Sequence, residues 1–263
     1  MTPNDFTQKY GPVALVTGAS SGIGRSFARA LAARGIDLVL VARRVDRLDE
    51  LAAALARDHG ATARVVQVDL SEADAARQML DATADLDVGL VVSNAGFGMK
   101  GDLASNDPAA MTRMLAVNCN TQMLLAHGFI PRLRARGRGG LLFTSSVEGL
   151  IGCPYSTGYS ASKAFVISLG EGLWGELTPE GIDVLTLCPG ATDTEAAASQ
   201  GIDPSTLTNM MSPDDVAELA LDNLTEGPTF IPSAHYKGLF DQLRAMPRRD
   251  ALKAMAMGMK PKQ

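Results

Sequence analysis

Pro12-Val-Ala-Leu-Val-Thr-Gly-Ala-Ser-Ser-Gly-Ile-Gly24 decides the fold of this chain, because it combines a strand, a glycine-rich turn and a helix start. The apolar run that ends at Thr17 does not alternate, as a strand buried on both faces requires. Glycines at positions 18, 22 and 24 allow a tight turn and a close backbone approach to a ligand. The helix that follows presents free N–H groups and a positive dipole end to a pyrophosphate. We interpret the stretch as a nucleotide-binding turn, with a purely structural turn as the alternative.

The same alternation of short apolar runs and longer helical patterns continues along the chain. Regular strand–helix alternation predicts right-handed βαβ units and a doubly wound, Rossmann-like α/β fold, with a parallel sheet of about seven strands between two helical layers. No linker or repeat interrupts the pattern, so we expect one domain over residues 1–263. The expected strands are 12–17, 37–42, 64–69, 88–93, 140–145, 182–187 and 228–232, and the expected helices are 22–34, 45–58, 71–84, 108–135, 157–178 and 213–226.

Composition and charge exclude several classes of protein. The 263 residues carry a net charge of -5 with scattered basic residues, which disfavours nucleic-acid binding. Cys119, Cys153 and Cys188 are too widely spaced for a disulfide framework or a zinc site, so we expect no metal. We see no signal peptide and no apolar run of about 18 residues, so no membrane span is expected and a cytoplasmic location is the default.

Two arginines follow the second expected strand, where NAD-binding folds place the group that contacts the adenosine ribose. An acidic side chain there holds the 2′-hydroxyl, whereas arginine accommodates a 2′-phosphate. Arg43 and Arg44 have fixed positive charge and planar donors that suit phosphate. We therefore favour NADP(H) over NAD(H), with a solvated helix start as the alternative interpretation of both residues.

Tyr159 and Lys163 are four residues apart in an expected helix, so the two side chains lie on one face. A phenol has a pKa of about 10 and exchanges protons poorly at neutral pH. A neighbouring ammonium favours the phenolate, which would bring the tyrosine toward efficient general acid–base catalysis. The pair alone is common in surface helices, and its meaning depends on the other motifs of the chain.

Those other motifs resemble the short-chain dehydrogenase/reductase family, and the resemblance covers nearly the whole chain. Ser146 precedes Tyr159 by the family spacing, and Asn118 falls where the family places a catalytic asparagine. Two departures are modest: Ser93 replaces the usual asparagine before the fourth-strand motif, and Thr121 replaces a glycine. The resemblance implies that the cofactor is held by Gly18, Ser20, Ser21, Gly22, Ile23, Gly24, Asp69, Leu70, Asn94, Ala95, Gly96, Pro189, Gly190, Thr192 and Thr194, together with Arg43, Arg44, Tyr159 and Lys163.

The resemblance also implies a reaction in which a ketone and a secondary alcohol are interconverted. Tyr159 would exchange the proton, and Lys163 would lower its pKa and hold the nicotinamide ribose. Ser146 would polarise the carbonyl group. Asn118 would support a proton relay to Lys163. The cofactor would supply the hydride, while the protein orients and polarises the substrate.

The expected substrate wall is mostly apolar, which suits a steroid-like or acyl-chain compound. Its implied members are Phe97, Ser146, Glu148, Cys153, Tyr159 and Met210, with Gly149, Leu150 and segment 195–211 around them. A 3-oxoacyl thioester reductase is the alternative enzyme, although the sequence shows no clear basic entrance for an acidic carrier. A non-catalytic NADP(H) sensor and a nucleotide-sugar epimerase are further alternatives, the latter disfavoured by the short C-terminal part.

Two expectations concern assembly and the end of the chain. Family members associate through their two long helices, which predicts a homotetramer or, failing that, a homodimer through 108–135 and 157–178. The methionine-rich segment 235–263 is expected to pack on the domain, on a neighbouring subunit or over the substrate pocket. Its role as a substrate lid is the less favoured alternative.

Overall fold

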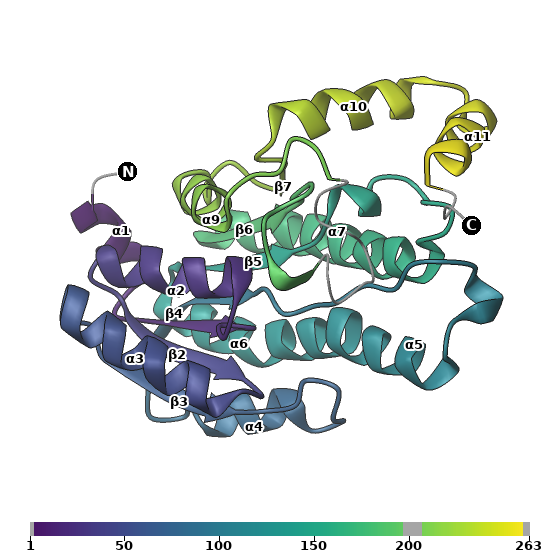
Figure 1. Ribbon diagram of the computed structural model, residues 1–263. Coiled ribbons are helices and arrows are strands. Elements are labelled where there is room, and N and C mark those ends of the chain that lie inside the picture. Colours follow the sequence, from purple (N-terminus) through teal and green to yellow (C-terminus); the bar gives the residue numbers. More distant parts are fainter. Residues whose placement is uncertain (1–2, 197–206, 260–263) are drawn as a thin grey trace.

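The computed structural model describes residues 3–196 and 207–259, and its centre is a parallel sheet of seven strands (Figure 1). The strands lie in the order β3-β2-β1-β4-β5-β6-β7, and every neighbouring pair is parallel. The predicted fold class is therefore confirmed. The strands are β1 (Val13–Thr17), β2 (Asp37–Ala42), β3 (Ala63–Gln67), β4 (Val88–Ser93), β5 (Gly139–Thr144), β6 (Ile182–Leu187) and β7 (Thr229–Phe230).

Helices cover both faces of the sheet. One apolar cluster joins the sheet to α2 (Gly22–Ala33), α3 (Val45–His59) and α9 (Pro213–Asp222). A second cluster joins the opposite face to α4 (Ala75–Asp81), α6 (Gln122–Arg136) and α7 (Thr157–Leu177). The two layers bury the central strands completely, which explains their continuous apolar sequences.

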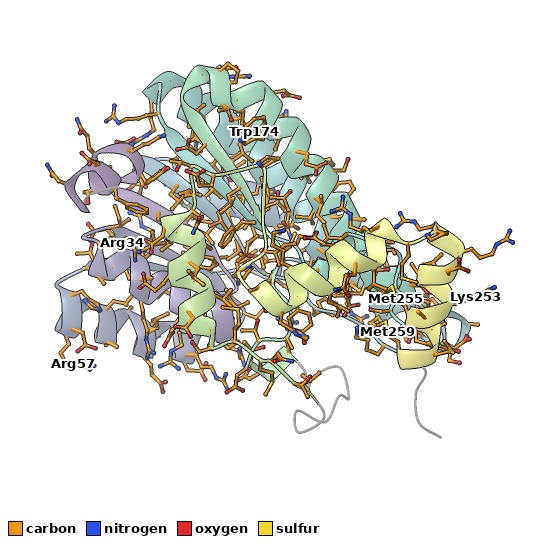
Figure 2. All side chains as sticks on the ribbon, turned by 90° about the horizontal axis from the view of Figure 1, so that it is seen from above. Arg34, Arg57, Trp174, Lys253, Met255 and Met259 are labelled. Atoms are coloured by element: carbon orange, nitrogen blue, oxygen red, sulfur yellow. The ribbon has the colours of Figure 1, made fainter. Side chains whose placement is uncertain are left out.

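A third apolar cluster lies beyond the carboxyl ends of the strands. It joins the short helix η3 (Val147–Gly149) to α10 (Ala234–Ala245) and α11 (Arg248–Met259), which form the C-terminal part of the described chain. Figure 2 shows α10 and α11 extending together to one side, with Met255 and Met259 on α11. Met255 is buried in the cluster, so this part of the methionine-rich segment packs against the domain.

The amino ends of the strands are closed by a helix that the sequence interpretation did not anticipate, α1 (Pro3–Tyr10). Tyr10 is fully buried and donates a hydrogen bond of 2.5 Å from its hydroxyl to Asp183, near the start of β6. Arg136, at the end of α6, donates to the carbonyl oxygen of Gly11 and pairs with Asp87. These contacts tie the beginning of the chain to the edge of the sheet that lies opposite the third cluster.

Three expected elements differ from the observed ones for local reasons. The helix expected over 71–84 is only α4, because the Asp69 carboxylate accepts from the backbone N–H and hydroxyl of Ser71 and fixes a turn. The expected strand 228–232 shortens to β7 between two prolines, which cannot donate ladder hydrogen bonds. The long helix expected over 108–135 is α5 (Pro108–Leu115) and α6, joined by a π-helical segment, Ala116–Thr121.

Among the described residues, no helix is long and apolar enough to cross a membrane. The same part of the chain contains no group of three or more potential metal ligands. All three cysteines are buried free thiols.

Candidate active site

The crevice at the carboxyl edge opens between β1 and β4, where the order of strands reverses and α/β sheets bind ligands. Two glycines in the turn after β1 have backbone conformations that other residues rarely adopt: φ is +69° at Gly18 and +53° at Gly22. A Cβ atom on Gly24 would lie 2.3 Å from the carbonyl oxygen of Gly18. The turn is therefore tightly closed on itself, and its backbone faces the crevice directly before α2 begins.

Asn94 and Thr17 tie the floor of the crevice together. The Thr17 hydroxyl oxygen accepts from the backbone N–H groups of Asn94 and Ala95, at 2.9 and 3.0 Å. The Asn94 side chain donates to the Thr17 carbonyl and accepts from the Thr144 hydroxyl. It thus links the ends of β1, β4 and β5. Sequence reasoning expected Asn94 to contact a cofactor, whereas its side-chain amide already holds the strand ends in register.

An arginine pair lies beside the glycine turn and holds a carboxylate of the same chain. Arg44 donates to the hydroxyls of Ser20 and Ser21, and its remaining nitrogen lies 2.9 Å from Glu195. Arg47, one helical turn later, lies 2.6 Å from the other Glu195 oxygen. Arg47, followed by Arg44, keeps the pKa of Glu195 down to about 2. An anion bound by two guanidinium groups and flanked by serine hydroxyls shows that this donor set suits a phosphate group.

Arg43 is separated from this pair. Its side chain is 76% exposed and lies 3.9 Å from Asp69. The Asp69 carboxylate accepts from the Ser71 backbone N–H, which is the main cause of its lowered pKa. Leu70 is buried, and its carbonyl accepts from Thr121 at 2.7 Å. Sequence reasoning grouped the two neighbouring arginines and missed Arg47, although its position one helical turn after Arg44 was a usable signal.

Lys163 lies at the base of the crevice and is only 3% exposed. Its ammonium donates to the carbonyl oxygen of Thr144 at 2.9 Å, and burial lowers its pKa to about 8. A Cβ atom on Gly96 would lie 3.0 Å from this ammonium and from the side-chain oxygen of Asn118. Gly96 therefore allows the loop after β4 to pass directly over both groups.

Tyr159 lies next to Ser146 and between two ammonium groups. Lys163 and Lys100 each place Nζ 5.7 Å from the centroid of the Tyr159 ring. The pKa of Tyr159 is nevertheless raised, first by burial and then by the charge of Glu148, while a hydrogen bond with Ser146 opposes the rise. The net direction is opposite to the lowering expected from the Tyr-x-x-x-Lys spacing, because desolvation of the phenolate outweighs the favourable contacts.

Ser146 is oriented by the helix that follows it. The backbone N–H of Glu148 donates to the Ser146 hydroxyl oxygen at 3.2 Å, so the serine caps η3. The serine hydrogen is then left to donate, either to Tyr159 or to a ligand atom in the crevice.

Asn118 lies in the π-helical segment and clamps the loop after β4. Its amide nitrogen donates to the Phe97 carbonyl at 2.9 Å and to the Ser162 hydroxyl at 3.0 Å, and its oxygen accepts from the Phe97 N–H at 3.1 Å. Both amide hydrogens are therefore used. The proton relay expected for Asn118 stays a prediction, and the observed contacts of its side chain are structural.

The segment after β6 folds back over the glycine turn. The Pro189 carbonyl accepts from Val147 at 3.1 Å, and the Thr194 methyl group would lie 3.0 Å from a Cβ atom on Gly22. A Cβ atom on Gly190 would lie only 2.1 Å from the ring of Tyr236, so α10 packs directly on this segment. Thr192 pairs with Met211 in an isolated bridge. The segment thus spans from the cofactor crevice to the C-terminal helices.

The residues expected to form the substrate wall divide into two groups. Phe97 and Met210 are exposed large apolar side chains, as a ligand-facing wall requires. Cys153 is only 2% exposed, is packed in the third cluster, and its thiol has a pKa raised to about 12 by burial. It therefore does not line an open surface. Of the expected segment 195–211, residues 197–206 lie outside the described part of the chain.

Glu148 makes an ion pair that sequence reasoning did not find. Lys100 Nζ lies 2.6 and 2.9 Å from the two Glu148 oxygens and 2.9 Å from the Ser156 hydroxyl. A cavity of about 460 Å³ follows next along the chain, lined by segment 101–104, Pro154, Tyr155, Thr157 and Ala256 of α11. Nothing in the sequence around Lys100 indicates its partner, which is 48 residues away.

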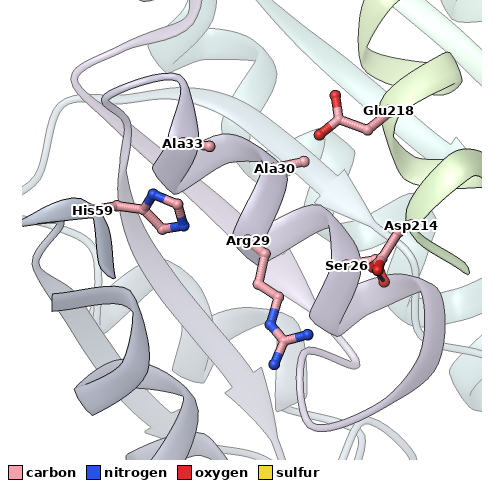
Figure 3. Close-up of a pocket in the computed structure, with 7 residues that line it drawn as sticks. All are labelled: Ser26, Arg29, Ala30, Ala33, His59, Asp214 and Glu218. Carbon is pink, nitrogen blue, oxygen red and sulfur yellow. Dashed lines mark hydrogen bonds between the residues drawn. The ribbon is translucent and has the colours of Figure 1, made fainter. Parts of the chain in front are cut away.

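A second hollow, of about 260 Å³, lies on the outside of the sheet layers between α2, α9 and the end of α3 (Figure 3). Its lining includes Arg29, His59 and Glu218, and Ser26 donates to Asp214 at 2.5 Å across the helix contact. None of the residues predicted for catalysis or cofactor binding lines it. We interpret it as a gap where these helices meet.

A doubly wound sheet with a glycine-lined crevice, beside which a serine, a tyrosine and a buried lysine meet, defines a nucleotide-binding α/β protein with an acid–base site. The model of the short chain dehydrogenase family matches residues 12–204, and the chain belongs to this family of oxidoreductases.

Characterised relatives cover almost the whole chain. A 7beta-hydroxysteroid dehydrogenase from Clostridium sardiniense is 33% identical over 249 residues, which span 94% of this chain and 95% of that protein. A short-chain dehydrogenase from Sphingobium yanoikuyae, solved in complex with NADPH, is 34% identical with a TM-score of 0.83, over 93% of this chain and 95% of that one. A structure of a 7beta-hydroxysteroid dehydrogenase has a TM-score of 0.88 at 26% identity, over 95% and 99% of the two chains.

Proposed function

We propose that this protein is an NADP(H)-dependent reductase that interconverts a ketone and a secondary alcohol on a largely apolar, steroid-like substrate. The observation that carries the proposal is the meeting of Ser146, Tyr159 and Lys163 beside a glycine turn flanked by Arg44 and Arg47. The hydroxysteroid dehydrogenase relatives and the NADPH-bound relative support the same reaction class.

The residues around the crevice suit NADP(H). The backbone N–H groups at the start of α2 would hold the pyrophosphate, and Arg44 with Arg47 would hold the 2′-phosphate in place of the Glu195 carboxylate. Lys163 would hold the nicotinamide ribose. When bound, the reduced cofactor supplies the hydride that the protein itself cannot provide.

Four side chains of the site would orient the substrate and transfer the proton. Ser146 accepts from the Glu148 N–H and is thereby turned to donate its own hydrogen to the substrate oxygen. The raised pKa of Tyr159 keeps the proton on the phenol, ready for transfer to that oxygen during ketone reduction. Lys163, with a pKa near 8, can return a proton toward Tyr159 at the pH of the cell. Asn118 fixes the loop after β4 where it passes over Lys163.

An apolar substrate is supported by the groups that border the site. Phe97 and Met210 expose apolar side chains, and the third cluster brings η3, α10 and α11 together beyond Ser146. A 3-oxoacyl thioester reductase would need basic groups for an acidic carrier, whereas Lys100 is already paired with Glu148. A steroid-like ketone is therefore the favoured substrate.

The test is an assay of bulky cyclic ketones and 3-oxoacyl thioesters with NADPH and NADH, comparing the wild type with Tyr159→Phe. Loss of the acid should reduce kcat by about 10² to 10⁴-fold while NADPH still binds. Tyr155→Phe, four residues earlier, is the matched control and should keep most of the activity. Unchanged turnover in Tyr159→Phe would refute the mechanism, and NADPH binding without turnover of any compound would favour a sensor.

We also propose that the protein assembles into a homotetramer, or a homodimer, through its long helices. The support is a set of large apolar side chains exposed on α5, α6 and α7; Trp174 is labelled in Figure 2. Burial of such side chains in an interface is favourable. The exposed apolar side chains that support the assembly are Leu115, Met123, Leu124, Phe165 and Trp174. A monomer seen by light scattering at micromolar concentration would contradict this assembly.

We further propose a cytoplasmic location, because three buried free thiols suit a reducing compartment.

A further inference from the structure

Lys100 and Glu148 form a partly buried ion pair near Tyr159. Lys100 lies in the loop after β4, and Glu148 lies in η3, two residues after Ser146. Each side chain is only 22% exposed. Charges this well covered are screened less by salt and water than charges on the open surface. The pair is therefore able to act on its neighbours through its electric field.

The ammonium of Lys100 has no hydrogen left for a substrate. An ammonium has three donors, and those of Lys100 face the two Glu148 oxygens and the Ser156 hydroxyl. Recognition of an acidic substrate would require breaking this arrangement. A role within the protein is thus better supported than a role as an anion anchor.

The neighbour that both charges reach is Tyr159. Lys100 Nζ is 5.7 Å from its ring centroid, the same distance as Lys163 Nζ. The negative charge of Glu148 acts on the phenol in the opposite sense to the positive charge of Lys100. The phenol is thus exposed to two opposite charges that belong to one ion pair.

Other titratable groups also face this centre. Cys153, in the loop after η3, and Cys188, after β6, are both near the phenol, and their raised pKa values keep them neutral at physiological pH. Tyr236 of α10 faces Glu148, which contributes to its raised pKa. At neutral pH, the charged groups near Tyr159 in the described part of the chain are therefore Glu148, whose charge raises its pKa, and the ammonium groups of Lys163 and Lys100, each 5.7 Å from the centroid of its ring.

We propose that Lys100 and Glu148 are positioning residues for catalysis, which adjust the acid–base strength of Tyr159 through two opposite charges held near its ring. This inference rests on the proposed function, in which Tyr159 is the proton donor and acceptor. While the pair is intact, the positive charge of Lys100 opposes the effect of Glu148 on the phenol. Removing one partner leaves the other unopposed, and the two removals then have opposite signs.

The signs of the two shifts follow from the form of Tyr159, phenol or phenolate, that each direction of the reaction uses. Alcohol oxidation needs the phenolate, so its rate rises with pH until the pKa of Tyr159 is passed. Glu148→Gln leaves Lys100 unopposed, which favours the phenolate and moves this acid limb to lower pH. Lys100→Met leaves Glu148 unopposed and moves the limb to higher pH. At the distances involved, each shift should be about one pH unit.

The experiment is the pH profile of kcat/KM for alcohol oxidation with saturating NADP⁺, measured on the intact protein. The four forms are the wild type, Glu148→Gln, Lys100→Met and the double variant, whose acid limb should lie between those of the two single variants. Lys100→Arg keeps the charge and should keep the profile. Glu180→Gln removes one partner of the exposed pair Arg134–Glu180 and should shift nothing.

A merely structural ion pair predicts a different pattern. If the pair only holds the loop after β4, both single variants should lose rate at all pH values, with no movement of the limb and no recovery in the double variant. That result would overturn the inference. If Lys100→Met does not fold, as judged by its melting temperature, Lys100→Gln takes its place, since glutamine still donates to Glu148.

The outcomes also separate this inference from the proposed function. An inactive Tyr159→Phe variant with unmoved profiles in the pair variants would refute the role of Lys100 and Glu148 alone. An active Tyr159→Phe variant would refute the proposed function itself. Opposite shifts of the two single variants, together with an inactive Tyr159→Phe variant, would support both.

Discussion

The cofactor side and the substrate side of the crevice are built in different ways. On the cofactor side, the glycine turn follows β1 directly and is held by backbone contacts, such as that between Gly24 and the Gly18 carbonyl. On the substrate side, η3, the loop after β4, α10 and α11 come together from distant parts of the chain. There the contacts are between side chains, as in the pair Lys100–Glu148.

This difference determines how each side should respond to substitution. A backbone-made site has no flexible atoms that can move away, so a small added group should disrupt it strongly. A site made of side chains can adjust by changing rotamers, so losses should be smaller and should depend on the neighbour. The following variants test that contrast, from the largest expected effect to the smallest.

Gly24→Ala should have the largest effect on cofactor binding. Its Cβ atom would lie 2.3 Å from the backbone oxygen of Gly18, so the turn or the start of α2 must shift. Overpacking of this kind costs about 1–3 kcal/mol, which predicts a loss of NADPH affinity of about 10- to 100-fold, measured by fluorescence titration.

Gly238→Ala in α10 is the matched control, since its Cβ atom would meet nothing within 4 Å. The added methyl group should stabilise this exposed helix by up to about 1 kcal/mol and leave NADPH affinity unchanged. Equal affinities in the two alanine variants would contradict the view that the glycine turn is closed by its own backbone.

Arg44→Met should weaken NADPH binding by about tenfold or more and leave NADH binding nearly unchanged. Hydrogen bonds to charged groups contribute about 1.5–3 kcal/mol, and Arg44 already holds both serine hydroxyls and an anion in this place. The ratio of the two dissociation constants is the quantity to measure.

Arg43 provides the control for that experiment, because its side chain is mostly exposed and is turned toward Asp69. Arg43→Met should change the ratio by less than Arg44→Met. Glu195→Gln should tighten NADPH binding, since it removes the carboxylate that holds the arginine pair. If Arg43→Met has the larger effect, Arg43 rather than Arg44 contacts the 2′-phosphate, and the present assignment is wrong.

Gly190→Ala tests the substrate side, where the obstacle is a side chain. Its Cβ atom would lie 2.1 Å from the ring of Tyr236, so the ring, or α10 that carries it, must shift. We expect KM for an apolar ketone to rise by several-fold, up to about tenfold, which corresponds to about 1.4 kcal/mol.

Tyr236→Ala removes the obstacle and should make the same glycine substitution less harmful. In the double variant, the loss should therefore be smaller than the product of the two single losses. Strict multiplication of the losses would show that Gly190 acts through its backbone conformation rather than through this ring.

The smallest expected effect is a dependence of the free energy of unfolding on pH, caused by Lys163 in the cofactor-free protein. Its folded pKa of about 8 is below the ordinary lysine value, so between these two values the unfolded chain binds more protons. Stability should then rise with pH, by about 1 kcal/mol between pH 7 and pH 9.

The measurement is urea unfolding at both pH values, with Lys163→Met as the variant that lacks this contribution. The buried thiols of Cys119, Cys153 and Cys188 have raised pKa values, so they lower stability as pH rises through the ordinary thiol value of about 8.5, and they do so in the wild type and the variant alike. The wild type should gain more stability than the variant over this interval. An equal gain would show that Lys163 is not held in a desolvated place.

The contrast between the two sides also explains what the sequence could predict. The parallel sheet of about seven strands and the glycine turn follow from the regular alternation of apolar runs and from the spacing of Gly18, Gly22 and Gly24, which are local properties. The placement of Tyr159 and Lys163 follows from one helical turn. Each of these features is encoded within a few neighbouring residues.

What the sequence could not predict depends on contacts between distant segments. The ion pair of Lys100 with Glu148 and the packing of Tyr236 on Gly190 bring together residues about fifty positions apart. The sequence predicted a lowered pKa for Tyr159, and this prediction was wrong because the pKa is raised. The spacing reveals a neighbouring charge but not the desolvation that opposes its effect. Burial is a property of the whole fold.

The helix at the amino ends of the strands has a practical consequence. Because α1 is fixed there through Tyr10 and α11 packs beside η3 at the opposite edge, Figure 1 shows the two chain ends on different sides of the molecule. An affinity tag or a surface tether attached before α1 should leave the crevice open to bulky compounds. The same tether attached after α11 would crowd the substrate entrance, so immobilised enzyme should be oriented through its N-terminal end.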